Sequence, residues 1–245
     1  MKWFHPAWLM AALLLCLGQP AAAQPLPAGS AKAATKTVGV LIYPQFEALD
    51  AYGPIEMWGN LNAAPAELWG GEEHRINFRV VTIAAEPGPV PTYQGPATMA
   101  QYGYADAPHV DYLVVPGGVG ADALMRDETA LAWLRATEKK ADMVTGVCNG
   151  ATILARAGIL DDLRATTNKM YWEQCAVGDT VHWVKDARWV DEGRIVTSSG
   201  ISAGIDMTLA VISKLYGERM GQWDARYAEY VANTDPHVDP FAVQR

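Results

Sequence analysis

The sequence is poor in the residues that several common kinds of function require. Lys and Arg number 19 against 27 Asp and Glu, so the net charge is −8, and no basic cluster stands out. A nucleic-acid-binding protein carries a basic face, so we expect no DNA or RNA partner. No internal repeat is visible. The 245 residues, 50% of them hydrophobic, suit one domain with a sizeable core.

Histidine is also scarce, with five residues in the chain. Four of them are scattered and lack the spacing of metal ligands: His74, His109, His182 and His237. We therefore expect no metal site. We expect no other cofactor.

The apolar stretch from Ala7 to Leu17 is too short to span a bilayer. Lys2 precedes it, and Ala21-Ala22-Ala23 follows as an A-x-A cleavage site, so residues 1–23 are predicted to be a secretory signal peptide. We expect a secreted protein, periplasmic in a Gram-negative host, without a stable membrane anchor. Residues 24–36 are rich in Ala, Pro and Gly and are predicted to be a mobile leader. Residues 37–245 then form a single domain.

Cysteine is nearly absent from that domain. Removal of the signal peptide takes Cys16 away and leaves Cys148 and Cys175. In an oxidising compartment these two could pair, and a bridge would abolish any nucleophile. Two lone cysteines are not a disulfide framework, so both states stay open.

Strand-like and helix-like segments alternate along the chain. Apolar runs predict buried strands at residues 37–43, 78–84, 111–115, 143–147 and 195–198. Helices are expected from Pro54 onward and over residues 129–141, 149–157, 202–217 and 218–231. This alternation predicts a parallel sheet covered on both faces, with the site at the carboxyl ends of its strands. The polar stretch 62–77 is predicted to be a loop or a lid.

The centre of the pattern is Cys148, in Gly146-Val147-Cys148-Asn149-Gly150. This matches the nucleophile elbow G-x-S-x-G with sulfur in place of oxygen. Glycine tolerates the sharp strand-to-helix turn that the elbow needs. The turn lies at the positive end of a helix dipole, which favours the thiolate. A buried core cysteine is the alternative, but it would not need a glycine two residues away on each side.

Four stretches resemble the ThiJ/PfpI superfamily, relatives of class I glutamine amidotransferases. They are residues 40–56 with L-D-x-x-G-P-x-E, residues 105–118 ending in P-G-G, the cysteine elbow, and residues 195–206 with A-G-I-D. Within the superfamily, the chain is most similar to isonitrile hydratases and to the amidase-like domains found ahead of AraC-type regulators. The resemblance implies a flavodoxin-like three-layer α/β sandwich with a mostly parallel sheet and the cysteine elbow. It also implies, usually, a homodimer.

The resemblance makes Cys148 the nucleophile and places Asp50 against it. An ionised Asp50 would oppose thiolate formation, whereas a protonated Asp50 could donate a hydrogen bond and favour it. Asp50 could instead be an ordinary helix cap before Gly53-Pro54. Asp206 is as compatible with a cap or a buried anchor as with a catalytic group.

Further site residues follow from the same comparison. The backbone N–H groups of Gly118 and Asn149 are expected to bind an oxyanion or nitrogen anion, with Gly117 and Gly200 in the surrounding walls. A tight turn is the alternative for Gly117 and Gly118. Asn168 is also expected among the oxyanion- or substrate-binding residues, and it stands after Thr166-Thr167, where many superfamily members have a histidine. Asparagine cannot act as a general base, which weakens a Cys–His protease or amidase interpretation.

The leading hypothesis is an exported, cofactor-free cysteine hydratase or hydrolase acting on a small molecule. Cys148 would attack the terminal carbon of an isonitrile, and a thioimidate would collapse to an N-substituted formamide. A glyoxalase-like or deglycase-like enzyme using Cys148 is the second hypothesis, which the absence of the histidine disfavours. The third is a non-catalytic periplasmic binder or redox sensor with an accessible thiolate of low pKa.

Overall fold

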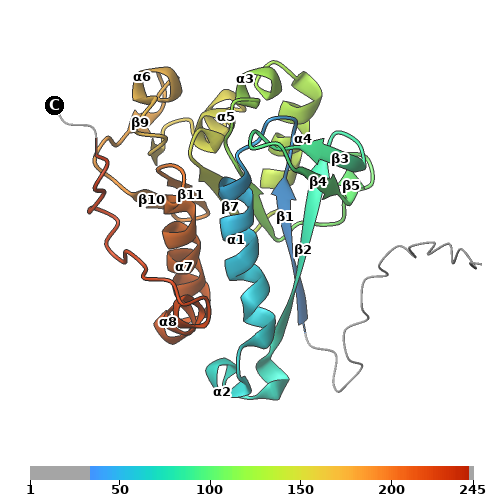
Figure 1. Cartoon of the computed structure of the whole chain (residues 1–245), viewed down its shortest axis with the longest axis vertical. Coiled ribbons are helices and arrows are strands. Elements are labelled where there is room, and N and C mark those ends of the chain that lie inside the picture. Colours follow the sequence, from blue (N-terminus) through green and yellow to red (C-terminus); the bar gives the residue numbers. More distant parts are fainter. Residues whose placement is uncertain (1–33, 243–245) are drawn as a thin grey trace, which may run out of the picture. The chain divides into compact units, whose positions relative to one another are not determined.

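The computed structural model describes residues 34–242. The predicted signal peptide and residues 24–33 of the predicted leader lie outside the described residues. A seven-stranded sheet in the order β10-β11-β7-β6-β1-β2-β5 is the central layer (Figure 1). Within the described range, no helix is long and apolar enough to cross a membrane.

The strands of the sheet are parallel except at one edge, where β10 pairs antiparallel with β11. Their bounds are β1 Ala34–Leu41, β2 Ile76–Ala84, β5 Tyr102–Gly103, β6 Tyr112–Val115, β7 Met143–Val147, β10 Trp189–Glu192 and β11 Ile195–Ser198. Every residue of β6, β7 and β11 is buried, as expected for strands covered on both faces. Two small sheets lie outside this layer: β3 (Gly88–Pro91) with β4 (Ala97–Ala100), and β8 (Arg164–Ala165) with β9 (His182–Trp183).

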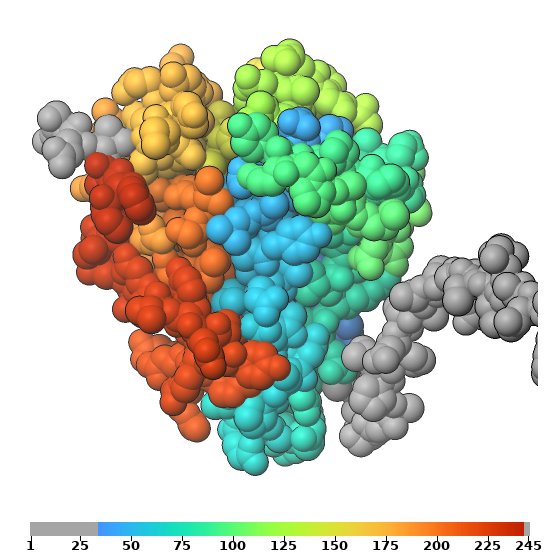
Figure 2. Space-filling view, in the orientation of Figure 1, coloured from blue at the N-terminus to red at the C-terminus, as the bar shows by residue number. Residues whose placement is uncertain are grey.

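Helices flank the sheet, as in a flavodoxin-like sandwich, so the predicted fold class is confirmed. The helices α1 (Ala48–Asn60), α7 (Ala203–Tyr216) and α8 (Glu218–Tyr227) pack against one another (Figures 1 and 2). The remaining α-helices are α2 (Ala66–Trp69), α3 (Ala121–Leu124), α4 (Glu128–Glu138), α5 (Gly150–Arg156) and α6 (Trp172–Cys175). Among these, α3 and α5 lie close to each other near the carboxyl ends of the strands.

Several boundaries differ from the sequence-based prediction, among them the end of α8 at Tyr227 and the starts of α1 and β1. Helix α1 begins at Ala48, so Pro54 lies inside it rather than at its start. A partner distant in sequence explains this, because the Ala48 N–H, which has no acceptor within the helix, donates to Gln94 Oε1 at 3.1 Å. Strand β1 begins at Ala34, inside the predicted leader, since residues 34–36 pair in register with β2. Both extensions are made by partners distant in sequence, which a local pattern does not show.

The polar stretch 62–77 is not a lid. It contains two 3-10 turns, Leu61–Ala63 and Glu72–His74, together with α2 and the first residues of β2. It connects the end of α1 to the start of β2, so it lies at the amino ends of the parallel strands (Figure 1). Asn62 ties it to the sheet by hydrogen bonds with both the N–H and the C=O of Phe78. The candidate site is at the opposite end.

Candidate active site

Cys148 occupies a strained turn between β7 and α5. Its φ is +57°, in the left-handed region that few side chains adopt. The flanking glycines are needed for space: a Cβ at Gly146 would lie 2.9 Å from Leu154 Cδ1, and one at Gly150 would lie 2.0 Å from the Val115 carbonyl oxygen. The predicted strand, sharp turn and helix are all present. Strain of this kind persists where the surrounding structure enforces it, often at functional sites.

Asn168 and Gly200 meet at the sulfur atom. Asn168 Nδ2 donates a hydrogen bond to Cys148 Sγ at 3.0 Å. A Cβ at Gly200 would lie 2.6 Å from Sγ and 2.8 Å from Asn168 Nδ2, so only glycine fits this wall. Thr167 Oγ1 also donates to the Cys148 carbonyl oxygen at 3.0 Å. The structure therefore brings three predicted site residues together from separate segments.

Asp50 projects from the first turn of α1 and is fully buried. Its Oδ2 accepts a hydrogen bond from the Gly117 N–H at 3.0 Å, and its Oδ1 is buried without a partner in the described part of the chain. Burial raises the pKa of Asp50 well above its ordinary value, and the charge of Glu47 adds to this. Hydrogen bonds from Gly117 and with Cys148 lower the pKa less than burial raises it. The protonated carboxyl is thus favoured next to the sulfur.

Burial also decides the protonation of Cys148, whose side chain is only 5% exposed. Burial, and then the charge of Asp50, raises the pKa of the Cys148 thiol well above its ordinary value. Hydrogen bonds from Asn168 and from the Asn149 backbone act in the opposite direction but are outweighed. From the sequence, the position of the elbow at the positive end of a helix dipole predicted a thiolate. The structure favours the thiol, because non-local packing removes water from the sulfur.

Hydrogen bonds join the loop after β6 to the cysteine elbow. The Gly118 N–H donates to Asn149 Oδ1 at 2.7 Å, and Asn149 Nδ2 donates to the Gly118 carbonyl oxygen at 3.1 Å. Gly117 lies so close that a Cβ there would be 2.1 Å from Asn149 Oδ1. The Gly118 N–H, expected to bind a substrate anion, is therefore already occupied. The Asn149 N–H acts on the Cys148 thiol instead, whose pKa it lowers slightly against the larger effect of burial.

Two contributing residues were not identified from the sequence. The buried Tyr43 hydroxyl donates to the Pro116 carbonyl oxygen at 3.0 Å, just before Gly117. Burial raises the pKa of Tyr43, with smaller contributions from the charges of Asp50 and Cys148. Thr167 supports the elbow as described above. Tyr43 is the last residue of the predicted strand 37–43, and this position at the carboxyl end of a strand could have identified it as a site residue.

The other cysteine and the remaining acid have different positions. Cys148 and Cys175 are both free thiols, so the alternative of a bridge is not realised in this structure. Asp206 is a buried anchor: Oδ2 accepts from Arg188 Nε at 2.7 Å, and Oδ1 accepts from the Tyr230 hydroxyl and the Asn233 N–H, each at 3.0 Å.

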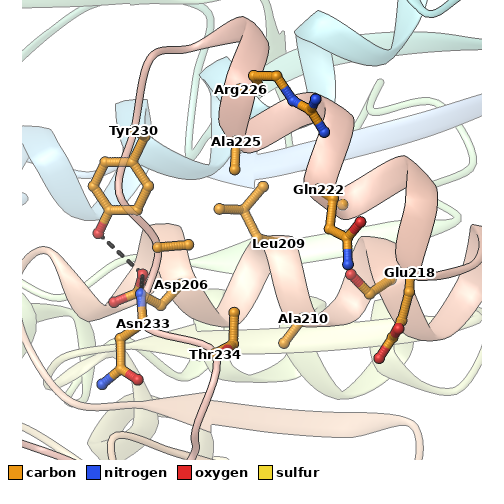
Figure 3. Close-up of a pocket in the computed structure, with 13 residues that line it drawn as sticks. Asp206, Leu209, Ala210, Glu218, Gln222, Ala225, Arg226, Tyr230, Asn233 and Thr234 are labelled. Carbon is orange, nitrogen blue, oxygen red and sulfur yellow. Dashed lines mark hydrogen bonds between the residues drawn. The ribbon is translucent and has the colours of Figure 1, made fainter.

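Asp206 borders a cavity of about 530 Å³ between α7, α8 and the C-terminal segment (Figure 3). Its lining contains none of the residues placed around Cys148. Among residues 34–242, no group of three or more His, Cys, Asp or Glu side chains is arranged to hold a metal ion.

A mostly parallel flavodoxin-like sheet with a cysteine at its nucleophile elbow defines the class of protein. A sequence model of the DJ-1/PfpI family matches residues 36–214, and the chain belongs to this family. The resemblance inferred from the four sequence stretches is confirmed.

Named relatives include both an enzyme and a regulator. Isonitrile hydratase of Pseudomonas putida is 32% identical over 197 residues, which cover 79% of this chain and 78% of that protein. The transcriptional regulator GbdR of Pseudomonas aeruginosa is 27% identical over 190 residues, covering 76% of this chain and 48% of the regulator. The crystal structure of a ThiJ/PfpI family protein from Pseudomonas syringae superposes with a TM-score of 0.70 at 24% identity, covering 82% of this chain and 77% of that one. Membership of the family is thus compatible with catalysis and with regulation.

Proposed function

We propose that the protein is a cysteine-dependent hydratase that converts an isonitrile to an N-substituted formamide. The observation that carries the proposal is a buried thiol beside a buried carboxyl whose pKa is raised. The similarity to isonitrile hydratase supports the same reaction. An isonitrile carbon accepts a proton and a nucleophile at one atom, so a neutral acid next to a sulfur suits it.

The first step forms a thioimidate. The Asp50 carboxyl gives its proton to the isonitrile carbon while Cys148 Sγ bonds to the same carbon. The thiol proton passes to Asp50, which is neutral again at the end of the step. One C–S bond and one C–H bond form, the S–H bond breaks, and R–N=CH–S–Cys148 results.

Water then completes the reaction. Its oxygen adds to the thioimidate carbon and a proton reaches the nitrogen through Asp50, giving R–NH–CH(OH)–S–Cys148. The C–S bond breaks as the hydroxyl proton is returned to sulfur, which releases the formamide and restores the thiol. Asn168 Nδ2 supports the departing sulfur, because a hydrogen bond to a charged acceptor is stronger than one to a neutral acceptor.

The test is turnover of benzyl isonitrile to N-benzylformamide near pH 7, followed by mass spectrometry. Cys148→Ala and Asp50→Asn are expected to abolish turnover, by at least about a thousandfold for the nucleophile. Cys175→Ala removes the other thiol and is expected to keep activity. Retained turnover in Cys148→Ala would show that the mechanism is wrong.

The alternatives have distinct readouts. A glyoxalase-like enzyme would consume methylglyoxal without glutathione, although Asn168 offers it no general base. A redox sensor would form a reversible sulfenic acid on Cys148 under mild peroxide. The buried, protonated thiol disfavours this, because oxidation follows thiolate character and exposure.

A homodimer is also proposed, supported by the family relationship rather than by any contact in this single chain. Light scattering of the purified protein tests it: a monomeric mass would contradict it.

A further inference from the structure

A second cavity lies at the carboxyl end of the sheet. It has a volume of about 320 Å³ and is formed where the chain leaves β1 and β2 and passes α3. Apolar side chains from these segments make up part of its lining: Ile42, Val90 and Leu124. Tyr43 also lines the cavity, and its hydroxyl group donates a hydrogen bond to the Pro116 carbonyl oxygen, in the loop that contains Gly117. None of the proposed chemistry uses this space.

The charged groups of the lining are all acidic. Glu86 is exposed at the end of β2, and Asp127 is half-buried at the start of α4. The lining contains no Lys, Arg or His. Asp127 Oδ1 caps α4 by accepting from the N–H groups of Thr129 and Ala130 at 2.9 and 3.2 Å, which leaves Oδ2 for another partner. An occupant therefore meets negative potential from two carboxylates.

Aromatic rings also line the cavity. Tyr104 stacks one face on Trp133, with ring centroids 4.9 Å apart and an interplanar angle of 22°, and the same ring lines the cavity. Burial, followed by the charge of Asp127, raises the pKa of Tyr104, so the field of that carboxylate reaches this ring. A neutral tyrosine ring attracts cations to its face.

We propose that this cavity binds a small organic cation, an ammonium group carried on an apolar body. The ammonium group lies between Glu86 and Asp127 against Tyr104, and the apolar part packs on Val90 and Leu124. An anionic ligand would be repelled, and a neutral one would leave the carboxylates without a matching charge. A hydrated metal ion would gain nothing from apolar walls, since hard cations take several oxygen ligands. The site is independent of the proposed hydratase reaction.

Titration calorimetry of the full mature domain with choline tests the proposal. The comparison ligand is 3,3-dimethylbutan-1-ol, which has the same shape with carbon in place of nitrogen. Choline is expected to bind one per chain and at least about tenfold more tightly than the alcohol. Glu86→Gln combined with Asp127→Asn is expected to weaken choline binding by about tenfold or more, because asparagine still caps a helix but carries no charge.

The matched control is Glu128→Gln, which removes the same charge beside Asp127 but outside the lining. It is expected to leave choline binding unchanged. Tyr104→Leu is expected to weaken binding of choline more than that of the alcohol, and thermal melts show whether each variant is folded. Equal affinity for the two ligands, unchanged affinity in the double variant, or no choline binding by the folded parent protein would each overturn the proposal.

Discussion

At the scale of single residues, Gly200 sets the space around the reacting sulfur. Gly200→Ala is expected to abolish formamide formation and to cost about 1–3 kcal/mol of unfolding free energy, because the new methyl group would overlap Cys148 Sγ and Asn168 Nδ2. Activity assays and urea denaturation measure the two effects. Gly59→Ala in α1 is the control: a Cβ there meets nothing within 4 Å, so it is expected to be neutral or slightly stabilising. Full activity in Gly200→Ala would contradict the claim that only glycine fits beside the sulfur.

The pH dependence of Cys148 is a second residue-scale prediction. Because its pKa is raised, alkylation by iodoacetamide in a Cys175→Ala background should be slow at pH 7 and should increase only above roughly pH 8.5. Asp50 is neutral near pH 7 but opposes the thiolate once it ionises at higher pH, whereas asparagine stays neutral throughout, so Asp50→Asn should move the midpoint to lower pH. Asn168→Ala removes a donor to the sulfur and should move it to higher pH. If the midpoint of the wild-type protein lay well below pH 8.5, Cys148 would be the thiolate that the elbow alone predicts, and the raised pKa would be contradicted.

At the scale of elements, Arg188 and Asp206 tie the C-terminal segment to α7. The Asp206 carboxylate joins Arg188 to the Tyr230 hydroxyl and the Asn233 N–H, and all of the Arg188–Asp206 contact is buried. Asp206→Asn is expected to cost about 3 kcal/mol, since a buried guanidinium loses its closest countercharge.

Urea denaturation monitored by tryptophan fluorescence measures this loss. Lys214→Gln breaks the exposed pair with Asp191 and serves as the control, with an expected cost below about 1 kcal/mol. Equal costs for the two variants would show that the buried pair is no stronger than a surface pair.

At the scale of the whole molecule, export is predicted from the N-terminal sequence and is testable directly. The full-length chain produced in a Gram-negative host is expected to appear in the periplasm with Gln24 as its first residue. Cell fractionation followed by N-terminal sequencing measures this. Lys2→Glu combined with a charged residue at Leu13 is expected to keep the chain uncleaved in the cytoplasm. An uncleaved wild-type chain would contradict the prediction.

Parts of the site could be predicted from the sequence because they consist of residues that are neighbours in the chain. The strand, glycines and helix around Cys148 occupy consecutive residues, and so does the Asp50 segment. The Gly118–Asn149 pair was missed because its hydrogen bonds join residues 31 positions apart. The start of α1 was placed too late, because Pro54 is a local start signal whereas the hydrogen bond from the Ala48 N–H to Gln94 is not.

The sequence by itself determined the class of fold, the cysteine elbow and the family, because apolar periodicity and short glycine motifs are properties of neighbouring residues. Only the tertiary structure decided the protonation of Cys148 and Asp50, the occupied Gly118 N–H, the position of residues 62–77 and the acidic cavity beside Tyr104. Each of these depends on burial or contact between distant segments. Removing water from a group is a collective effect of everything packed around it, and no local pattern in the chain encodes it.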